Sequence, residues 1–133
     1  MRAKRSYTTD KAKDAIGHDP DTLELLDMAN LEEADTGVAG VIYVSTQQGS
    51  HGPRVKWYPS RPTSRTDDCL SVTIAATPRV FNHGLPKVLE TRIADPLTRW
   101  VALNHGALLD FWQNGWRWTR GEVSDFFDHL QKV

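Results

Sequence analysis

The chain has 133 residues, a formal net charge of −1 and one cysteine, with 39% hydrophobic and 25% charged residues. This length allows one domain with a substantial core, and the composition is that of an ordinary soluble protein. The single Cys69 excludes an intrachain disulfide framework, and no apolar segment approaches the length that spans a membrane. We therefore expect a cytoplasmic protein that does not contact membranes.

The N-terminal part is predicted to contain a polar arm followed by a helix. Residues 1–18 form a basic, polar arm. Asp19 followed by Pro20 is typical of a helix start, because the carboxylate can accept a hydrogen bond from a free backbone N–H and proline gives up an N–H that has no partner. A helix is predicted from residue 19 to about 34, ended by Thr36-Gly37, and its modest apolar face is formed by Leu23, Leu26, Leu31 and Ala34.

Three segments are predicted to be strands, and a fourth is predicted to be a short return strand. Residues 38–46 are apolar and β-branched on both faces, which indicates a central strand. Residues 54–58 alternate, with Val55 and Trp57 on one face and charged side chains on the other. Residues 70–76 alternate most regularly, after a turn-rich connection at 59–68. Val80-Phe81 is predicted to be a short return strand.

The C-terminal half is predicted to be helical. A short helix begins at Pro86 and stops or kinks at Asp95-Pro96, where a central helix begins that runs to about Gln113. Its apolar stripe consists of Leu97, Trp100, Val101, Leu108, Phe111 and Trp112. Asn104 falls within this stripe, so we expect its amide to bond a backbone group of the sheet or a loop end, with a ligand contact as the alternative. A final helix follows the capping box of Thr119 and Glu122.

Together these elements predict an α+β fold. A small, mainly antiparallel sheet of three or four strands packs against the central amphipathic helix, with N- and C-terminal helices added. We expect residues 19–133 to form a single α+β domain behind the arm of residues 1–18.

Charge is unevenly distributed along the chain. Eight acidic residues lie between Asp14 and Asp35, and no Lys or Arg occurs between Asp14 and Arg54. Residues 51–65 then carry four cations and no acid. Either the acidic segment covers the basic hairpin within the molecule, or the two charged faces point to different partners.

The basic hairpin is the first candidate site. Its residues could contact phosphate through cations and stack a base on an aromatic ring: His51, Arg54, Lys56, Tyr58, Arg61 and Arg65. The alternative is a solvated strand face with Trp57 packed in the core. In an enzymatic version, His51 is a general acid or base and Arg54 or Lys56 stabilises a phosphorane, as a metal-free ribonuclease requires.

The connection before the last helix is the second candidate site. Trp116 and Trp118 flank Arg117 and either anchor a protein partner or pack as a staple of the last helix. The five histidines lack metal-ligand spacing and no glycine-rich phosphate loop occurs, so we expect no metal and no cofactor.

Residues 41–112 resemble a small bacterial family of unknown function, which has an HGPPHFH-type hairpin, an LPK and a helix with spaced tryptophans. The likeness is carried by His51-Gly52-Pro53, Leu85-Pro86-Lys87, Trp100, Leu103, Leu108-Leu109 and Trp112. The later histidines of the family hairpin are replaced here by Val55 and Trp57. The resemblance implies a small α+β domain that binds a partner, with a family-like core of about residues 38–115 and no established reaction. Members look like short proteins encoded in pairs suggestive of toxin–antitoxin or mobile-element modules.

We therefore expect a non-enzymatic interaction or regulatory protein of a bacterial mobile element or toxin–antitoxin-like module, which acts by binding another protein. An inhibitor of a host defence complex belongs to this class. The alternative is a nucleic-acid-binding or RNA-cleaving toxin-like domain that uses the basic hairpin of residues 51–65. A third possibility is a housekeeping structural subunit.

Overall fold

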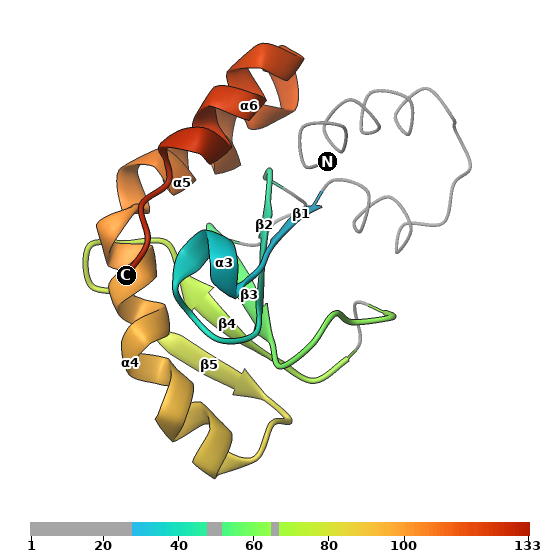
Figure 1. Ribbon diagram of the computed structural model, residues 1–133, viewed down its shortest axis with the longest axis vertical. Coiled ribbons are helices and arrows are strands. Elements are labelled where there is room, and N and C mark those ends of the chain that lie inside the picture. The colour runs from blue at the N-terminus through green and yellow to red at the C-terminus, as the bar shows by residue number, and fades with distance from the viewer. Residues whose placement is uncertain (1–27, 48–51, 65–66) are drawn as a thin grey trace.

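The computed structural model describes residues 28–47, 52–64 and 67–133, and it shows an α+β fold, as predicted (Figure 1). The strands are β1 (Met28–Leu31), β2 (Val41–Ser45), β3 (Arg54–Tyr58), β4 (Cys69–Thr73) and β5 (Val80–His83). The helical segments are α3 (Glu33–Thr36), α4 (Lys87–Leu103), α5 (His105–Asn114), the 3-10 turn η1 (Gly115–Arg117) and α6 (Arg120–His129). The predicted basic arm and the predicted helix up to residue 27 lie outside the described residues.

The strands form one antiparallel sheet of five strands in the order β1-β2-β3-β4-β5, so each strand pairs with the next one along the chain. The sequence predicts three or four strands. The predicted strands at residues 38–46, 54–58 and 70–76 correspond to β2, β3 and β4, and the short return strand is β5. The additional strand is β1, at one edge.

The prediction of a helix from residue 19 to about 34 is wrong at its C-terminal end. Residues 28–31 form β1, in which Ala29 pairs with Val44 and Leu31 pairs with Ile42. The side chains of Ala29 and Leu31 are both buried in the core. Pairing with the edge of β2 bonds the backbone and buries alternate side chains, and the local sequence pattern cannot show that such an edge is available. Only residues 33–36 are helical here, and Gly37 ends α3 with a left-handed φ of 83°.

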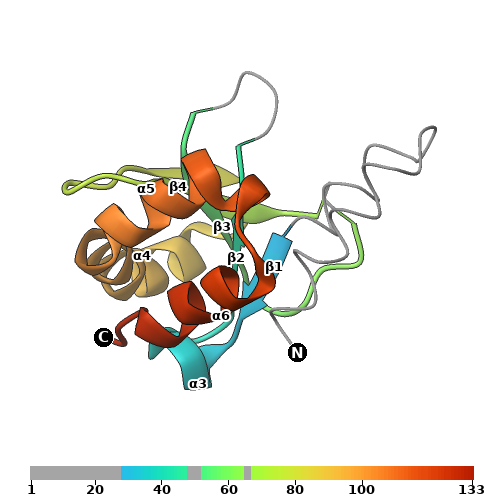
Figure 2. The ribbon, with the colours of Figure 1, turned by 90° about the horizontal axis from the view of Figure 1, so that it is seen from above.

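One face of the sheet packs against the helices. Val55, Trp57, Leu70 and Val72 belong to the core, and α4, α5 and α6 lie along this side of the sheet (Figure 2). The helices contribute Ile93, Leu97, Trp100, Val101, Leu108, Phe111, Trp112, Val123, Phe126 and Phe127. Because successive side chains of a strand point to opposite faces, the residues between the core residues point away from the helices. We call this second face the outer face.

Helix α4 continues through Pro96, where the sequence predicts a stop or a kink and the start of the central helix; the stop is not observed. A proline inside a helix costs about 3 kcal/mol, because it removes one hydrogen bond and crowds the preceding turn. Ile93 and Leu97 on either side of Pro96 are buried, and burying two such side chains contributes at least as much. Asp95 is therefore not an N-cap. It lies inside α4, where its Oδ2 accepts a hydrogen bond from Nε of Arg99 at 3.1 Å.

The predicted central helix from Asp95 to Gln113 is divided at Asn104, between α4 and α5. The Asn104 Nδ2 donates hydrogen bonds to the carbonyls of Trp100 and Gln131, each at 3.0 Å. Its Oδ1 accepts a hydrogen bond from the Gln131 N–H at 2.8 Å. The buried amide thus bonds backbone groups, as expected, and it fixes the C-terminal tail. A side chain that bonds backbone groups competes with the regular helix, which explains the break.

The last helix begins as predicted. The Thr119 Oγ1 accepts a hydrogen bond from the Glu122 N–H at 3.2 Å, and Glu122 Oε1 accepts one from the Thr119 N–H at 2.8 Å. These reciprocal bonds satisfy two backbone donors at the start of α6. Within the described part of the chain, no helix is both long and apolar enough to cross a membrane.

Candidate functional site

The outer face of the sheet carries basic, polar and aromatic side chains, and the five strands contain no acidic residue. The cross-strand register sets these side chains in rows. Lys56 pairs with Ser71, and Ser71 pairs with Phe81 on the next strand. Arg54 pairs with Thr73. Paired residues project from the same face, so the cations of β3 and the aromatic ring of β5 share one surface.

Arg79 and Phe81 extend this surface at the edge of the sheet. Phe81 is 45% exposed. The Arg79 N–H donates a hydrogen bond to Thr73 Oγ1 at 2.9 Å, and the Thr73 N–H donates one to the Arg79 carbonyl at 3.0 Å. The guanidinium carbon of Arg79 lies 5.4 Å from the centre of the Phe81 ring, which is within the range of a cation–π interaction. Sequence reasoning placed Phe81 in a short return strand but named neither residue as a candidate site, although their alternate positions before and on a strand were a usable signal.

His83 is the exposed histidine of the outer face. Its Nε2 lies 3.0 Å from the Ser71 Oγ, which is a hydrogen-bonding distance, and it pairs in register with Cys69. A serine activated by histidine also needs a group that orients the histidine. Among the described residues, no carboxylate is hydrogen-bonded to His83. The pair therefore presents an oriented imidazole on the surface, without the third member of a catalytic triad.

Cys69 is a poor nucleophile in this position. Burial raises the pKa of its thiol, and this effect outweighs the lowering by the Lys56 ammonium, by the hydrogen bond with Tyr58 and by the Arg54 guanidinium. A thiol with a raised pKa carries little thiolate at neutral pH, and thiolate is the reactive form.

The outer face is not accessible over its whole area. Tyr43 and Tyr58 contact each other edge to face, with ring centres 5.4 Å apart, and both are buried. They form an apolar cluster with Val41 and Cys69. Tyr58 is only 2% exposed, so it offers little surface for stacking, and Trp57 is buried on the core side. The accessible residues lie towards β5. We call the following five residues the basic strip: Arg54, Lys56, Arg79, Phe81 and His83.

The other candidates of the basic hairpin lie elsewhere. Arg61 is in the connection between β3 and β4, and its Nη2 forms an ion pair with the Glu32 Oε2 at 3.3 Å. Both side chains are largely exposed, so this pair contributes little stability, about 0–1 kcal/mol. It does join the acidic segment to the basic hairpin at one point. His51 and Arg65 lie outside the described residues.

In the segment from Trp116 to Trp118, the two tryptophans have different environments, and the role of a partner anchor stays a prediction. Trp118 packs against Phe111 and Phe126, with ring centres 5.8 Å apart in each case. Trp116 is 49% exposed. The Arg117 Nη2 donates a hydrogen bond to the Asn114 Oδ1 at 2.8 Å. Trp118 therefore acts as part of the packing of α6, and Trp116 is the residue of this segment that presents a large ring to the surface.

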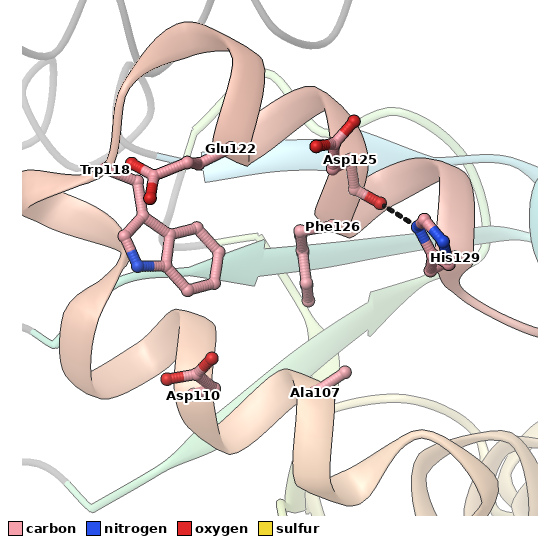
Figure 3. A pocket seen from close by; sticks show the side chains of 7 residues that line it. All are labelled: Ala107, Asp110, Trp118, Glu122, Asp125, Phe126 and His129. Carbon is pink, nitrogen blue, oxygen red and sulfur yellow. Dashed lines mark hydrogen bonds between the residues drawn. The ribbon is translucent and has the colours of Figure 1, made fainter.

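A pocket of about 390 Å³ lies between α5 and α6, on the helix side of the sheet (Figure 3). Its lining combines two aromatic rings with three carboxylates: Ala107, Asp110, Trp118, Glu122, Asp125, Phe126 and His129. Sequence reasoning missed this pocket. The spacing of Glu122, Asp125 and His129 on one face of a helix was a signal. That these residues share a pocket with Asp110 on α5 depends on how the two helices pack.

No group of three or more metal-binding side chains lies together in residues 28–47, 52–64 and 67–133.

Comparisons with known proteins identify no relative. The resemblance to the small bacterial family stays a prediction, because no family model, no curated protein and no solved structure matches this chain.

Proposed function

We propose that the protein is a non-enzymatic binding protein whose basic strip binds single-stranded nucleic acid. The observation that carries this proposal is the register of β3, β4 and β5, which gathers cations and an exposed aromatic ring on strands that contain no acidic residue. This is the second of the functions expected from the sequence. The described geometry favours it because both the phosphates and the bases of a single strand have a counterpart on the strip.

The phosphates are matched by the three lysine and arginine residues of the strip. Arg54, Lys56 and Arg79 lie on or beside neighbouring strands of one face. A phosphate chain that crosses the strands can contact all three. Since each contact with a single strand lowers the slope of log K against log salt by about 0.7, three contacts predict a slope of about −2. Because only three phosphate contacts contribute, we also expect weak binding at physiological salt.

The bases are matched by Phe81. Its ring is partly exposed, and the guanidinium of Arg79 lies over it, so a base can stack on the ring beside a cation. Unpaired bases are required for this contact, since bases within a duplex already stack on their neighbours. A sheet face with an exposed ring therefore favours single strands over duplexes.

The test compares two matched double variants by fluorescence anisotropy with a labelled single-stranded oligonucleotide. Arg54→Gln/Lys56→Gln removes one arginine and one lysine from the basic strip. Lys87→Gln/Arg92→Gln is the matched control, because it also removes one lysine and one arginine, but from the exposed surface of α4. We expect the first variant to bind more weakly and its salt slope to fall in magnitude by about 1.4, from the loss of two contacts. The second should bind as the unaltered protein does.

Phe81→Ala tests the stacking contribution separately. It should weaken binding to the single strand without changing the salt slope, because it removes no charge. Equal losses in the two double variants would show that binding follows net charge alone. No measurable binding at low salt would rule out the proposed function.

A further inference from the structure

We propose that the pocket between α5 and α6 binds an arginine side chain of a protein partner. The pocket lies on the helix side of the sheet, so this site is separate from the basic strip and does not depend on it (Figure 3). Its charge is also opposite, which means that it selects a cationic group where the strip selects an anionic one.

The inner wall of the pocket is aromatic. Trp118 and Phe126 have ring centres 5.8 Å apart, and Phe126 is in turn stacked on Phe111 at 4.6 Å. These contacts hold both pocket rings in fixed positions, so little side-chain entropy is lost when a ligand packs against them. A ring face attracts a cation through its quadrupole, and tryptophan does so most strongly.

The rim of the pocket is acidic on both sides. Asp110 comes from α5, while Glu122 and Asp125 come from α6 (Figure 3). Two of the carboxylates are positioned by bonds within the protein. The Asp110 Oδ1 accepts a hydrogen bond from Asn114 Nδ2 at 2.7 Å, and the Glu122 Oε1 accepts one from the Thr119 N–H. Each of these bonds uses one of about four acceptor positions on a carboxylate, so both groups retain capacity for a ligand.

The combination of an aromatic wall and carboxylates from two helices matches a guanidinium better than an ammonium. A guanidinium is planar, so it stacks on an aromatic face, and its edge donates hydrogen bonds to carboxylates in pairs. A lysine ammonium is a compact, strongly hydrated charge and gains less from the rings. Arginine is also enriched among the residues that dominate protein interfaces.

The probe is a short peptide, acetyl-Gly-Gly-Arg-Gly-Gly-amide, and the reference is the same peptide with citrulline, which has the shape of arginine without its charge. The full-length protein is titrated with each peptide, and the Trp118 indole N–H is followed by NMR. This signal is assigned by its absence in Trp118→Phe. We expect the arginine peptide to shift the Trp118 signal in a saturable manner at about millimolar concentration, and the citrulline peptide to leave it unchanged.

Matched charge variants test the rim. Asp110→Asn/Asp125→Asn should weaken binding of the arginine peptide roughly tenfold, because both sides of the pocket lose a carboxylate. The control, Asp95→Asn/Asp128→Asn, makes the same change in charge at exposed positions that do not line the pocket. It should bind the peptide unchanged. Thermal melts establish that both variants are folded.

Three results would overturn the proposal. The first is an equal response to the arginine and citrulline peptides, and the second is an equal loss in the two double variants. The third is self-association of the unaltered protein in sedimentation that Asp110→Asn/Asp125→Asn abolishes. In that case the occupant of the pocket is a second copy of this chain.

Discussion

Trp57 and Trp100 are both fully buried in the core, but their indole N–H groups differ. The Trp57 Nε1 donates a hydrogen bond to the Ala39 carbonyl at 2.7 Å. The Trp100 Nε1 has no hydrogen-bond acceptor in the described part of the chain. Replacing each tryptophan by phenylalanine removes the same atoms from the core, so the two variants differ mainly in what happens to hydrogen bonding.

The expected difference can be worked from these contacts. Trp57→Phe removes a hydrogen bond, which contributes about 1 kcal/mol, and leaves the Ala39 carbonyl without this donor. Trp100→Phe removes a buried donor whose lack of a partner costs about 1–3 kcal/mol. The cavity terms are similar, so Trp57→Phe should be less stable than Trp100→Phe by roughly 2–4 kcal/mol. Trp100→Ala removes the whole ring and should lower the unfolding free energy by about 3–5 kcal/mol.

Urea unfolding monitored by circular dichroism measures these differences directly. Trp116→Phe is the control, because this ring is exposed and its truncation should change stability by less than about 0.5 kcal/mol. The three phenylalanine variants should have equal m values, since all unfold the same chain. The reasoning is refuted if Trp57→Phe and Trp100→Phe unfold at the same urea concentration. An unchanged midpoint for Trp100→Ala would show that the helix stripe is not the core.

Three further predictions concern chemistry at the surface and in the sheet. The purified protein should not cleave RNA in a manner that depends on His51 or His83, and cleavage of an RNA pool that is lost in a folded His51→Ala or His83→Ala variant would contradict this. If the acidic segment covers the basic strip, replacing the acidic residues between 19 and 27 with the corresponding amides should raise the salt concentration at which the full chain elutes from heparin, whereas unchanged elution would show that the two charged faces point apart. These residues lie outside the described part of the chain, and residues 28–36 should be retained because they form β1 and α3. Because burial raises the pKa of Cys69, the folded protein favours the neutral thiol, so this residue affects stability little below its ordinary pKa of about 9 and reduces stability as the pH rises above that value. In urea unfolding, the free energy of unfolding should therefore fall more between pH 8 and pH 10 for the unaltered protein than for Cys69→Ser.

Several features of this fold could be read from residues a few positions apart. The alternation of Val55 and Trp57 with cations predicted both the strand and its core face, and the structure confirms both. The capping box of Thr119 and Glu122 placed the start of the last helix correctly. In each case the determining interactions are local, either the two-residue period of a strand or a bond between positions three apart, so the sequence contains the whole signal.

Other features depended on partners that are distant in the sequence. Residues 28–31 form a strand because the edge of β2 is available, and α4 continues through Pro96 because the side chains around it are buried against the sheet. The binding surfaces have the same origin. Lys56 and Phe81 share a face through the register of three strands, and Asp110 and Asp125 line one pocket because α5 and α6 pack together. The sequence determines which charges and rings are present. Strand register and helix packing decide which of them lie on one surface, because register and packing depend on burying apolar surface over the whole chain.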